Sequence, residues 1–430
     1  MLWLMLSNTC FAGVRRVPLN YPTIQAAIDA SAHGDIVLVA PGVYTGDGNR
    51  DIDFKGKVIT VKSEAGPRTC IVDCQGSPQE DHRGFFFHSR ESTTSVLEGF
   101  SIINGHVGYG GGGIRCLDSS PNVRNCVVNG NRAQGAGAGI QLMGSNATLD
   151  NCLVSGNYGY SKSPSGRQWM GGGIYCSGGR PIFSNCTIVG NRTEEMDGGG
   201  MVCNNSSGQP ETIALNNCII FGNIVIRTLY TKGTQLIADP TLNITGSNTV
   251  TVDIQNSCIE AGPDAIFVLA WSTPSQAPAS SCIRTDPEFA KLGYWDLNGT
   301  PNDPNDDFWV GGDYHLKSQA GRWDLASEAW VKDNVTSPCI DTGDPNSPIG
   351  QEPFPNGGRI NMGAYGGTAE ASKSYFGEAL CDTIIAGDIN GDCKVDFKDL
   401  TLMAMNWLRD PFQDSGQGTD GSPPRSPTDR

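Results

Sequence analysis

The sequence predicts an all-β solenoid, and three observations support this prediction. One short pattern is repeated four times between residues 108 and 223, so that its Asn-Cys pair recurs after 26, 34 and 32 residues. Each copy holds short apolar strands bounded by Gly and Asn, without the apolar period of a helix. The chain has 56 Gly residues and only 8% aromatic residues, as in proteins built from strands and turns. Stacked copies of such a unit bury one continuous core that a single copy could not form.

Each copy contains two predicted strands. The first follows a run of small residues, and these first strands are centred on Arg115, Gln141, Tyr175 and Val202. The second strand surrounds the Asn-Cys pair, where the alternation of side chains predicts three inward columns. The inward columns are Val123, Leu149, Phe183 and Leu215; Cys126, Cys152, Cys186 and Cys218; and Val128, Val154, Ile188 and Ile220. The residues predicted to point outward are Arg124, Asp150, Ser184 and Asn216.

A column of asparagines stands where the second strand must bend into the next one. Its members are Asn125, Asn151, Asn185 and Asn217. Asn tolerates the left-handed backbone conformation and can pass amide hydrogen bonds along a stack, so we expect a stacked corner at this column. His106 is assigned by the same alignment to the later column of Asn131, Asn157, Asn191 and Asn223, as a turn residue.

These repeats resemble the right-handed parallel β-helix proteins, the architecture of pectate lyases and related polysaccharide-processing enzymes. The resemblance implies a right-handed parallel β-helix over residues 14–375 and a protein associated with polysaccharides. The residues that match are the stacking ones, so the resemblance concerns the fold more than the activity.

The N-terminal residues predict export and a capped solenoid. Residues 1–12 form an apolar run that ends in small residues, which resembles the end of a secretory signal peptide and predicts a secreted or cell-surface protein. The run is short and lacks a basic leading region, as a truncated signal peptide would. Thr23 then precedes a short amphipathic helix with Ile24, Ala27 and Ile28 on one face, which we expect to cap the open end of the solenoid.

The 15 cysteines allow two interpretations. Disulfides are the default in an exported protein, but cysteines that recur at one rung position are typical of buried thiols that pack as small apolar side chains. Two such columns are Cys126, Cys152, Cys186 and Cys218, and Cys116, Cys176 and Cys203. We predict reduced thiols in these columns and name Cys70 with Cys74 as the pair for a local disulfide.

The charge of the chain excludes some classes of partner. Its 30 Lys and Arg against 45 Asp and Glu give a formal net charge of −15. Nucleic acid is therefore an unfavourable partner, and no basic stripe is present for an anionic membrane surface. No run approaches the roughly 18 apolar residues of a membrane span.

A candidate substrate site lies in the third copy, which is longer than the first near residues 158–169. Insertions on a solenoid collect on one face and often form its binding site. Tyr158, Tyr160 and Trp169 offer aromatic faces for sugar rings, and the alternative is that these three side chains cover the side of the solenoid. Arg115 and Tyr175, outward residues of the first strands, would form a line along the neighbouring sheet.

The repeat weakens beyond residue 223. Strands are predicted near 242–244, 250–254 and Cys258, followed by a long irregular segment over 261–330. Residues 337–367 resemble the closing rungs of secreted bacterial β-helix proteins, so we expect the solenoid to end near Ser372.

The strongest chemical motif is a calcium loop after the solenoid. Oxygen-bearing side chains occupy loop positions 1, 3, 5, 9 and 12, and position 7 offers a backbone carbonyl, which is the set that Ca²⁺ requires. These positions are Asp388, Asn390, Asp392, Asp396 and Asp399, with Lys394 at position 7. Calcium is the cofactor that we predict.

A helix is predicted directly after this loop, over residues 400–408. A loop with Asp at position 12 followed by such a helix resembles a type I dockerin repeat, the calcium-folded module that attaches secreted polysaccharide-degrading enzymes to cohesin partners. The resemblance implies a dockerin-like half module over residues 386–409 and a cohesin-like partner. The chain departs from the family at Cys393, where the loop favours Gly, and in having one repeat where the family has two. The tail over residues 410–430 is predicted to be disordered.

Two classes of function remain open. A binding protein needs only the solenoid, the aromatic insertion and the calcium module, and the sequence favours polysaccharide binding of this kind. The alternative is a polysaccharide lyase or glycoside hydrolase, which would need a carboxylate cluster or a basic residue placed for acid and base chemistry. The charged candidates in the repeats are Arg115, Asp118, Arg124, Asp150 and Asp197. Arg124 and Asp150, one rung apart, more simply pair with each other.

Overall fold

The computed structural model describes residues 12–160, 171–194, 198–205, 211–229, 234–238, 242–246, 250–260, 266–268, 281–300, 306–377, 387, 389 and 394–407. The chain divides into two compact units, Met1–Ser374 and Tyr375–Arg430. In the part of the chain so described, no helix is long and apolar enough to cross a lipid bilayer.

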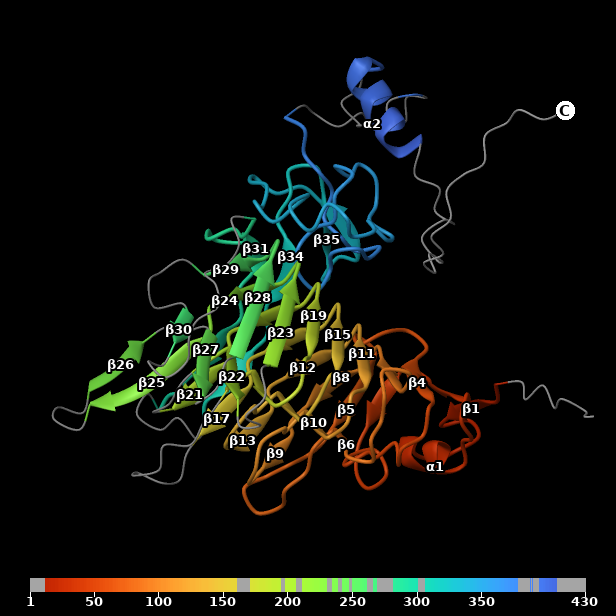
Figure 1. Ribbon diagram of the computed structural model, residues 1–430, viewed down its shortest axis with the longest axis vertical. Helices are drawn as coiled ribbons and strands as arrows, with labels where there is room; N and C mark the ends of the chain where they lie inside the picture. The colour runs from red at the N-terminus through yellow and green to blue at the C-terminus, as the bar shows by residue number, and fades with distance from the viewer. Residues whose placement is uncertain are drawn as a thin grey trace, which may run out of the picture. The chain divides into compact units, whose positions relative to one another are not determined.

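The first unit is a right-handed parallel β-helix, as predicted (Figure 1). A typical rung places one strand in each of four sheets, which we call A, B, C and D, and each sheet runs along the stack. Strands of successive rungs pair in parallel, and β26 is the antiparallel exception, next to β25 at the edge of sheet D. Most strands hold only three or four residues because each must turn at a corner of the rung.

Sheet A contains β1 (Val14–Val17), β2 (Ile36–Val39), β4 (Thr60–Ser63), β7 (Val96–Glu98), β11 (Asn122–Arg124), β15 (Thr148–Asp150), β19 (Ile182–Ser184), β23 (Glu211–Asn216) and β28 (Val250–Gln255). Sheet B contains β3 (Gly42–Tyr44), β5 (Cys70–Asp73), β8 (Ser101–Ile103), β12 (Val127–Asn129), β16 (Leu153–Ser155), β20 (Thr187–Val189), β24 (Ile219–Phe221) and β29 (Cys258–Ile259).

Sheet C contains β6 (Phe85–Phe87), β10 (Ile114–Leu117), β14 (Ile140–Met143), β18 (Ile174–Ser177), β22 (Met201–Asn205), β27 (Leu242–Gly246) and β30 (Ile266–Val268). Sheet D contains β9 (His106–Val107), β13 (Arg132–Gln134), β17 (Tyr158–Tyr160), β21 (Arg192–Glu194), β25 (Ile224–Leu229) and β26 (Thr234–Ala238).

The core is built from columns of identical rung positions. Val123, Leu149, Phe183 and Leu215 are register partners on successive strands of sheet A, and all are buried. The cysteine and aliphatic columns predicted from the sequence are buried in the same core cluster. The three inward columns are therefore confirmed, while the outward residues such as Arg124 and Asp150 are half-buried.

The cysteines of the described residues are all free. This confirms reduced thiols for the stacked columns. The suggested disulfide between Cys70 and Cys74 is wrong. The two residues stand four apart around a single extended strand, β5, which separates their backbones by about 13 Å at about 3.3 Å per residue, and a disulfide spans at most about 7 Å.

The sequence predicted a left-handed corner and an amide ladder in the same asparagine column, but the structure divides these two roles between two columns. Asn125, Asn151, Asn185 and Asn217 have φ values of 52°, 50°, 50° and 56°, so the predicted left-handed corner is confirmed. The amide ladder, however, runs through the other column. Asn131 Nδ2 donates to Asn157 Oδ1 at 3.0 Å, Asn157 Nδ2 to Asn191 Oδ1 at 2.9 Å, and Asn191 Nδ2 to Asn223 Oδ1 at 2.9 Å. These four side chains are fully buried, whereas in the first column only Asn217 is, so water competes for most amides of the first column but not for those of the second.

The N-terminal end of the stack is capped as predicted. Helix α1 (Ile24–Asp29) begins after Thr23, whose side chain accepts a hydrogen bond from the amide of Ala26. Its buried residues, Ile24, Ala27 and Ile28, join the core of the first rungs. Strand β1, which precedes this helix and pairs with β2, was not expected from the sequence.

Residues 281–374, which we call the cover segment, do not add the closing rungs that the sequence suggested. Among the described residues the parallel ladders end at β28, β29 and β30, apart from one parallel bridge between Cys258 of β29 and Ile283. The cover segment instead runs back over the outer face of sheet B, where Asn151 Nδ2 donates to Ala364 O and the amide of Gly363 donates to Asn217 O. It contains three antiparallel pairs where an irregular chain was expected. The pairs are β31 (Phe289–Lys291) with β34 (Asp313–Leu316), β32 (Tyr294–Asp296) with β33 (Phe308–Val310), and β35 (Arg322–Asp324) with β36 (Ala329–Val331).

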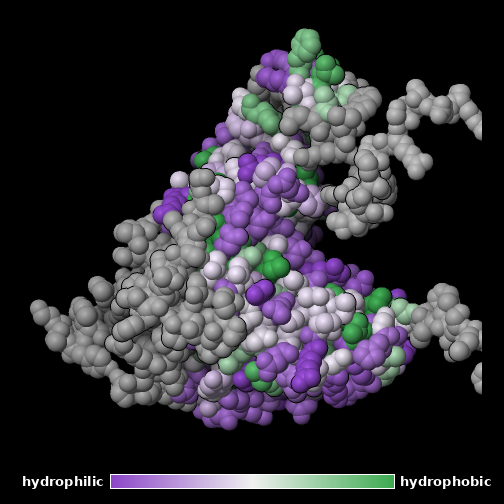
Figure 2. Space-filling model, viewed as in Figure 1, coloured by the Kyte–Doolittle hydropathy of each residue, from purple (hydrophilic) through white to green (hydrophobic). Residues whose placement is uncertain are grey.

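A second apolar cluster holds the cover segment on the solenoid. It joins outward residues of sheet B, including Leu153, Val189 and Ile219, to Phe289 and Met362 of the cover segment. The outer face of sheet B is apolar where it is covered, so this face is removed from solvent in the rungs from β12 to β29, whereas Val43 of the first rung is 62% exposed. On the face seen in Figure 2, the described residues are mostly hydrophilic, with apolar residues in separate small groups.

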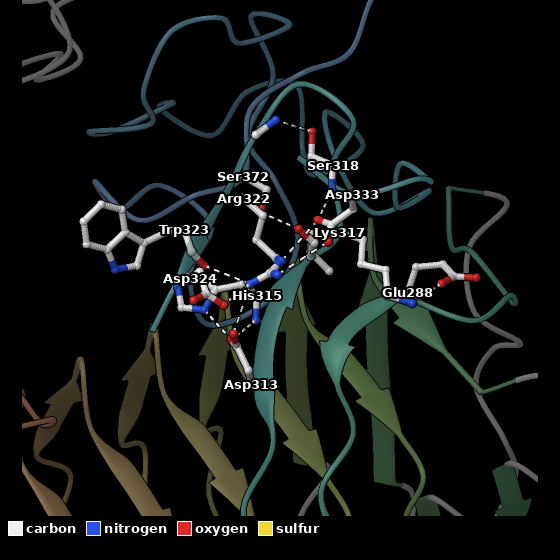
Figure 3. Close-up of polar contacts among 12 residues, drawn as sticks. Glu288, Asp313, His315, Lys317, Ser318, Arg322, Trp323, Asp324, Asp333 and Ser372 are labelled. Atoms are coloured by element: carbon white, nitrogen blue, oxygen red, sulfur yellow. Dashed lines mark hydrogen bonds and ion pairs between the residues drawn. The ribbon is translucent and has the colours of Figure 1, made fainter. Parts of the chain in front are cut away.

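A polar network fixes the cover segment internally (Figure 3). His315 is fully buried and contacts Asp313 through Nδ1 at 2.6 Å and Glu370 through Nε2 at 3.3 Å. Burial lowers the pKa of His315, but the hydrogen bonds to the two carboxylates outweigh this and raise it. Arg322 contacts Asp313 at 3.2 Å and Asp333 at 3.1 Å. Both ring nitrogens of His315 are engaged, so this network acts as a structural clamp.

The second unit contains helix α2 (Phe397–Trp407). Its first turn holds Asp399, whose carboxylate accepts hydrogen bonds from the amides of Ile389 and Asp396, each at 2.7 Å. Val395, Phe397 and Leu400 are exposed.

The amide ladder leads to a stability prediction. Asn157 Nδ2 donates to Val128 O, Ser155 O and Asn191 Oδ1, so Asn157→Asp would place a carboxylate against three acceptors in a buried site. We expect a loss of several kcal/mol in the free energy of unfolding, measured by urea denaturation. Asn125→Asp is the matched control, because Asn125 is exposed and Asp also tolerates the left-handed backbone. Equal midpoints for the two variants would contradict the ladder.

The buried carboxyl of Glu352 leads to a pH prediction. Burial raises the pKa of Glu352 from 4.5 to about 7, against the hydrogen bonds that it accepts from the amides of Asn361 and Gly367. Because the folded state holds this proton more tightly than the unfolded state, stability is greatest below pH 4.5 and falls as the pH rises toward 7, by about 1.4 kcal/mol per pH unit.

Melting temperatures of the wild type and of Glu352→Gln between pH 4.5 and 8 test this. The wild type should lose stability through this window, and the variant, whose amide does not titrate, should lose less. Parallel curves for the two proteins would show that Glu352 is not the titrating group.

Candidate functional site

The insertion tyrosines lie on sheet D, and the first of them is buried. Tyr158 is 1% exposed, and its ring contacts the guanidinium of Arg192, 4.3 Å from the ring centroid, and the indole of Trp295, at 5.9 Å. The expectation that Tyr158 offers a face to a sugar is therefore wrong, because the ring is buried. Tyr160 is half-buried, and its hydroxyl lies 3.0 Å from His106 Nε2. Trp169 lies outside the described residues.

The other two predicted residues lie on sheet C. Arg115, Gln141 and Tyr175 are register partners, which confirms the predicted line. Tyr175 is only 6% exposed and accepts a hydrogen bond from Asn204 at 3.0 Å, so its ring is not available as a platform. Arg115 is half-buried, with its guanidinium over the rings of Phe86 and Tyr109. The four described residues therefore do not form one site, because Tyr158 and Tyr160 lie on sheet D and Arg115 and Tyr175 on sheet C.

A cleft brings a different set of residues together where sheet B turns into sheet D. We call it the Gly130 cleft. It consists of two hollows of about 330 and 350 Å³ that share Asn104, Gly130 and Arg132. Trp295, Phe308, Trp309 and Asn129 line the first hollow. Asp73, Gln75 and His106 line the second.

The register of sheet D places the basic residues of this cleft. His106 pairs with Arg132, Arg132 with Tyr158, and Tyr158 with Arg192. His106 therefore belongs to the Arg132 column, and its assignment to the Asn131 column is wrong by one position. In the rung of His106, Gly105 occupies the position that an asparagine of the amide ladder holds in the later rungs. Its main-chain amide donates to Asn131 Oδ1, so Gly105 lies at the end of the ladder.

The aromatic wall of the cleft comes from the cover segment. Trp295 and Trp309 are cross-strand partners on the β32–β33 hairpin, with ring centroids 5.5 Å apart. Trp295 Nε1 donates to Gly190 O at 2.9 Å, and Asp307 forms a 2.6 Å ion pair with Arg192 in which both side chains are buried. Sequence reasoning missed this wall because the hairpin was read as irregular chain. The paired aromatics Tyr294-Trp295 and Phe308-Trp309 were the available signal.

The charged groups at the cleft are held by neighbours. Burial lowers the pKa of Arg132, whose guanidinium lies 5.3 Å from the ring centroid of Tyr158 and donates to the main-chain oxygen of Asp307. His106 is nearly buried, and its Nδ1 lies 3.9 Å from Asp81. Burial and the charge of Asp81 raise the pKa of Tyr160, so its phenol remains a hydrogen-bond donor.

A larger cleft of about 430 Å³ lies at the opposite corner, between sheet A, sheet B and the cover segment. Its charged groups already have partners. Arg68 lies 3.2 Å from Glu328 and 3.8 Å from Glu370. Glu98 pairs with Arg124 at 2.8 Å, so the expected pairing of Arg124 with Asp150 is wrong.

The calcium loop falls partly outside the described residues. Asp388, Asn390 and Asp392 lie in that part, whereas Lys394, Asp396 and Asp399 are described. Asp399 is buried, and its two carboxylate oxygens accept backbone amide hydrogen bonds within the loop. Within the described ranges no group of three or more His, Cys, Asp or Glu residues is placed to hold a metal ion. Calcium therefore stays a prediction.

Comparison with known proteins agrees with this fold. A family model for a right-handed beta helix region matches residues 81–253. A second model, described as disaggregatase related, matches residues 301–343. The crystal structure of pectate lyase Pel9A is similar at 16% identity and a TM-score of 0.40, over 82% of this chain and 95% of that one. No curated protein matches the chain.

Proposed function

We propose that this protein binds a polysaccharide in the Gly130 cleft. The observation that carries the proposal is an aromatic wall, formed by Trp295, Phe308 and Trp309, that lines the same open hollow as Asn104 and Asn129. A sugar ring has apolar C–H faces and a rim of hydroxyl groups. Aromatic faces beside amide groups match both parts of such a ring.

The rigid setting of the wall favours binding. The buried pair of Arg192 and Asp307 and the hydrogen bond from Trp295 to Gly190 hold the hairpin on the solenoid. A ligand that stacks on this hairpin therefore orders few side chains on binding, and the entropic cost of association is small.

We further propose that the protein is secreted or held at the cell surface and that its C-terminal loop binds calcium. The loop would use Asp388, Asn390, Asp392, Asp396 and Asp399 with the main-chain carbonyl of Lys394. Calcium would neutralise the carboxylates and couple metal binding to folding of the loop. A dockerin-like half module would then attach the solenoid to a cohesin-like partner.

A second candidate function is polysaccharide cleavage, as a lyase or a glycoside hydrolase. The observation in its favour is the 3.0 Å contact between His106 Nε2 and the Tyr160 hydroxyl, with Arg132 on the next rung. These groups can exchange a proton with a substrate, which acid and base chemistry requires. An assay for new reducing ends or unsaturated products, run on each polysaccharide that binds, tests this candidate.

Removal of one exposed ring tests the binding proposal. Phe308 is 48% exposed and lines the cleft, so Phe308→Ala should weaken binding to ligands found on a carbohydrate array by about tenfold, or about 1.4 kcal/mol. Tyr294→Ala is the matched control, because Tyr294 is 53% exposed on the same hairpin and does not line the cleft. Equal loss in both variants, or none in either, would place the ligand elsewhere.

Calorimetric titration of the full chain tests the calcium proposal. Wild type should release heat on binding Ca²⁺, and the double variant Asp388→Ala, Asp399→Ala should not, because it removes two carboxylates from one loop. The control is Asp414→Ala with Asp420→Ala, which removes the same charge from the tail outside the loop. Unchanged calcium heat in the loop variant would overturn the assignment.

A further inference from the structure

A column of glycines borders the Gly130 cleft and shapes its floor. Gly130, Gly156, Gly190 and Gly222 occupy the same place in successive rungs, one residue before the asparagines of the amide ladder, and their φ values are 64°, 57°, 63° and 61°. Backbone of this left-handed kind favours Gly. Without side chains, these corners present flat backbone to whatever lies outside them.

Trp309 occupies two of these corners. A Cβ atom placed on Gly156 would lie 2.0 Å from Cγ of Trp309, and one placed on Gly190 would lie 2.0 Å from Cη2. The indole ring therefore lies flat across two rungs, with its five-membered ring over the first and its far edge over the second. The solenoid thus already holds one planar ring on a seat made of glycine backbone.

The next corner in the column is open. A Cβ atom placed on Gly130 would have no heavy atom within 4 Å, yet Gly130 lines both hollows of the cleft, next to Arg132 and Asn104. Trp309 and Phe308 line the hollow on one side of it. This seat repeats the backbone geometry of the one that Trp309 fills.

Two observations indicate what fits there. The amide of Asn104 is exposed and lines both hollows, so it can form a hydrogen bond with a hydroxyl group of a ligand. The charges nearby disfavour an anion. Asp73 lines the cleft, Asp81 lies 3.9 Å from His106, and Arg132 is already engaged with Asp307 and Tyr158.

We propose that the open seat at Gly130 binds one pyranose ring of a neutral polysaccharide. The C–H face of the ring rests on the glycine backbone and its edge meets Trp309, while a hydroxyl group of the ring forms a hydrogen bond with the amide of Asn104. This inference rests on the proposed polysaccharide binding and adds both the position of one sugar and its charge class.

Two asparagine substitutions test the seat. Gly130→Asn fills it, and Asn tolerates the left-handed backbone better than other side chains do. Gly222→Asn is the matched control, because Gly222 has a φ of 61° and equally open surroundings but lines neither hollow. The melting temperatures of the two variants should be equal, which separates loss of binding from loss of folding.

The probes are neutral hexasaccharides of β-linked glucose, mannose and xylose, with hexagalacturonate as the anionic counterpart, each titrated into the full chain. We expect at least one neutral probe to bind the wild type more tightly than hexagalacturonate does, and to bind Gly130→Asn at least about tenfold more weakly than Gly222→Asn.

Equal affinity of the two variants for the neutral probe would overturn the seat, and tighter binding of hexagalacturonate by the wild type would overturn the charge class. Neither result affects the test of the cleft with Phe308→Ala, so failure of this inference and failure of the proposed function are distinguishable. If no probe binds the wild type, the inference falls together with polysaccharide binding.

Discussion

The structure depends on hydrogen bonds that each rung can make only with its neighbours. Four buried asparagines form an amide ladder along the stack, namely Asn131, Asn157, Asn191 and Asn223. Each of the first three donates a side-chain hydrogen bond to the next, and the side-chain amides also donate to main-chain oxygens of the preceding rung and of their own rung. A rung taken alone would leave these groups unsatisfied at a cost of about 1–3 kcal/mol each. The ladder therefore sets the register of sheets B and D, and with it the spacing of every column that faces outward.

The register of the ladder is what builds the candidate site. Because each ladder asparagine follows a left-handed glycine, the corners of successive rungs align into a strip of bare backbone. Trp309 uses part of that strip as a packing surface, and the corner at Gly130 continues it into the cleft. The glycines that the left-handed turns require thus also form the surface proposed to bind the ligand.

The cover segment converts one face of the solenoid into a second core. Leu153 and Ile219 point away from the rung interior, yet they pack against Phe289 and Met362. The clamp of His315, Asp313 and Arg322 stiffens the segment, and the buried pair of Arg192 and Asp307 connects it to sheet D. The aromatic wall is therefore carried by a segment that is stiffened internally and anchored to the solenoid beside Trp309, which suits a surface that binds a ligand without rearrangement.

By itself the sequence determined the repeat, the inward columns, the capping helix and the left-handed corner at Asn125. These features follow from rules that act within a few residues, and the four copies of the repeat show the columns and the corner four times over. The tertiary structure alone decided which asparagine column forms the ladder, because burial selects it, and which aromatics meet the solenoid. Trp309 lies more than a hundred residues from the glycines it covers, in a contact made once, so no periodic pattern could reveal it. The buried position of Tyr158 was hidden for the same reason, since its neighbour Trp295 reaches it only when the cover segment folds back.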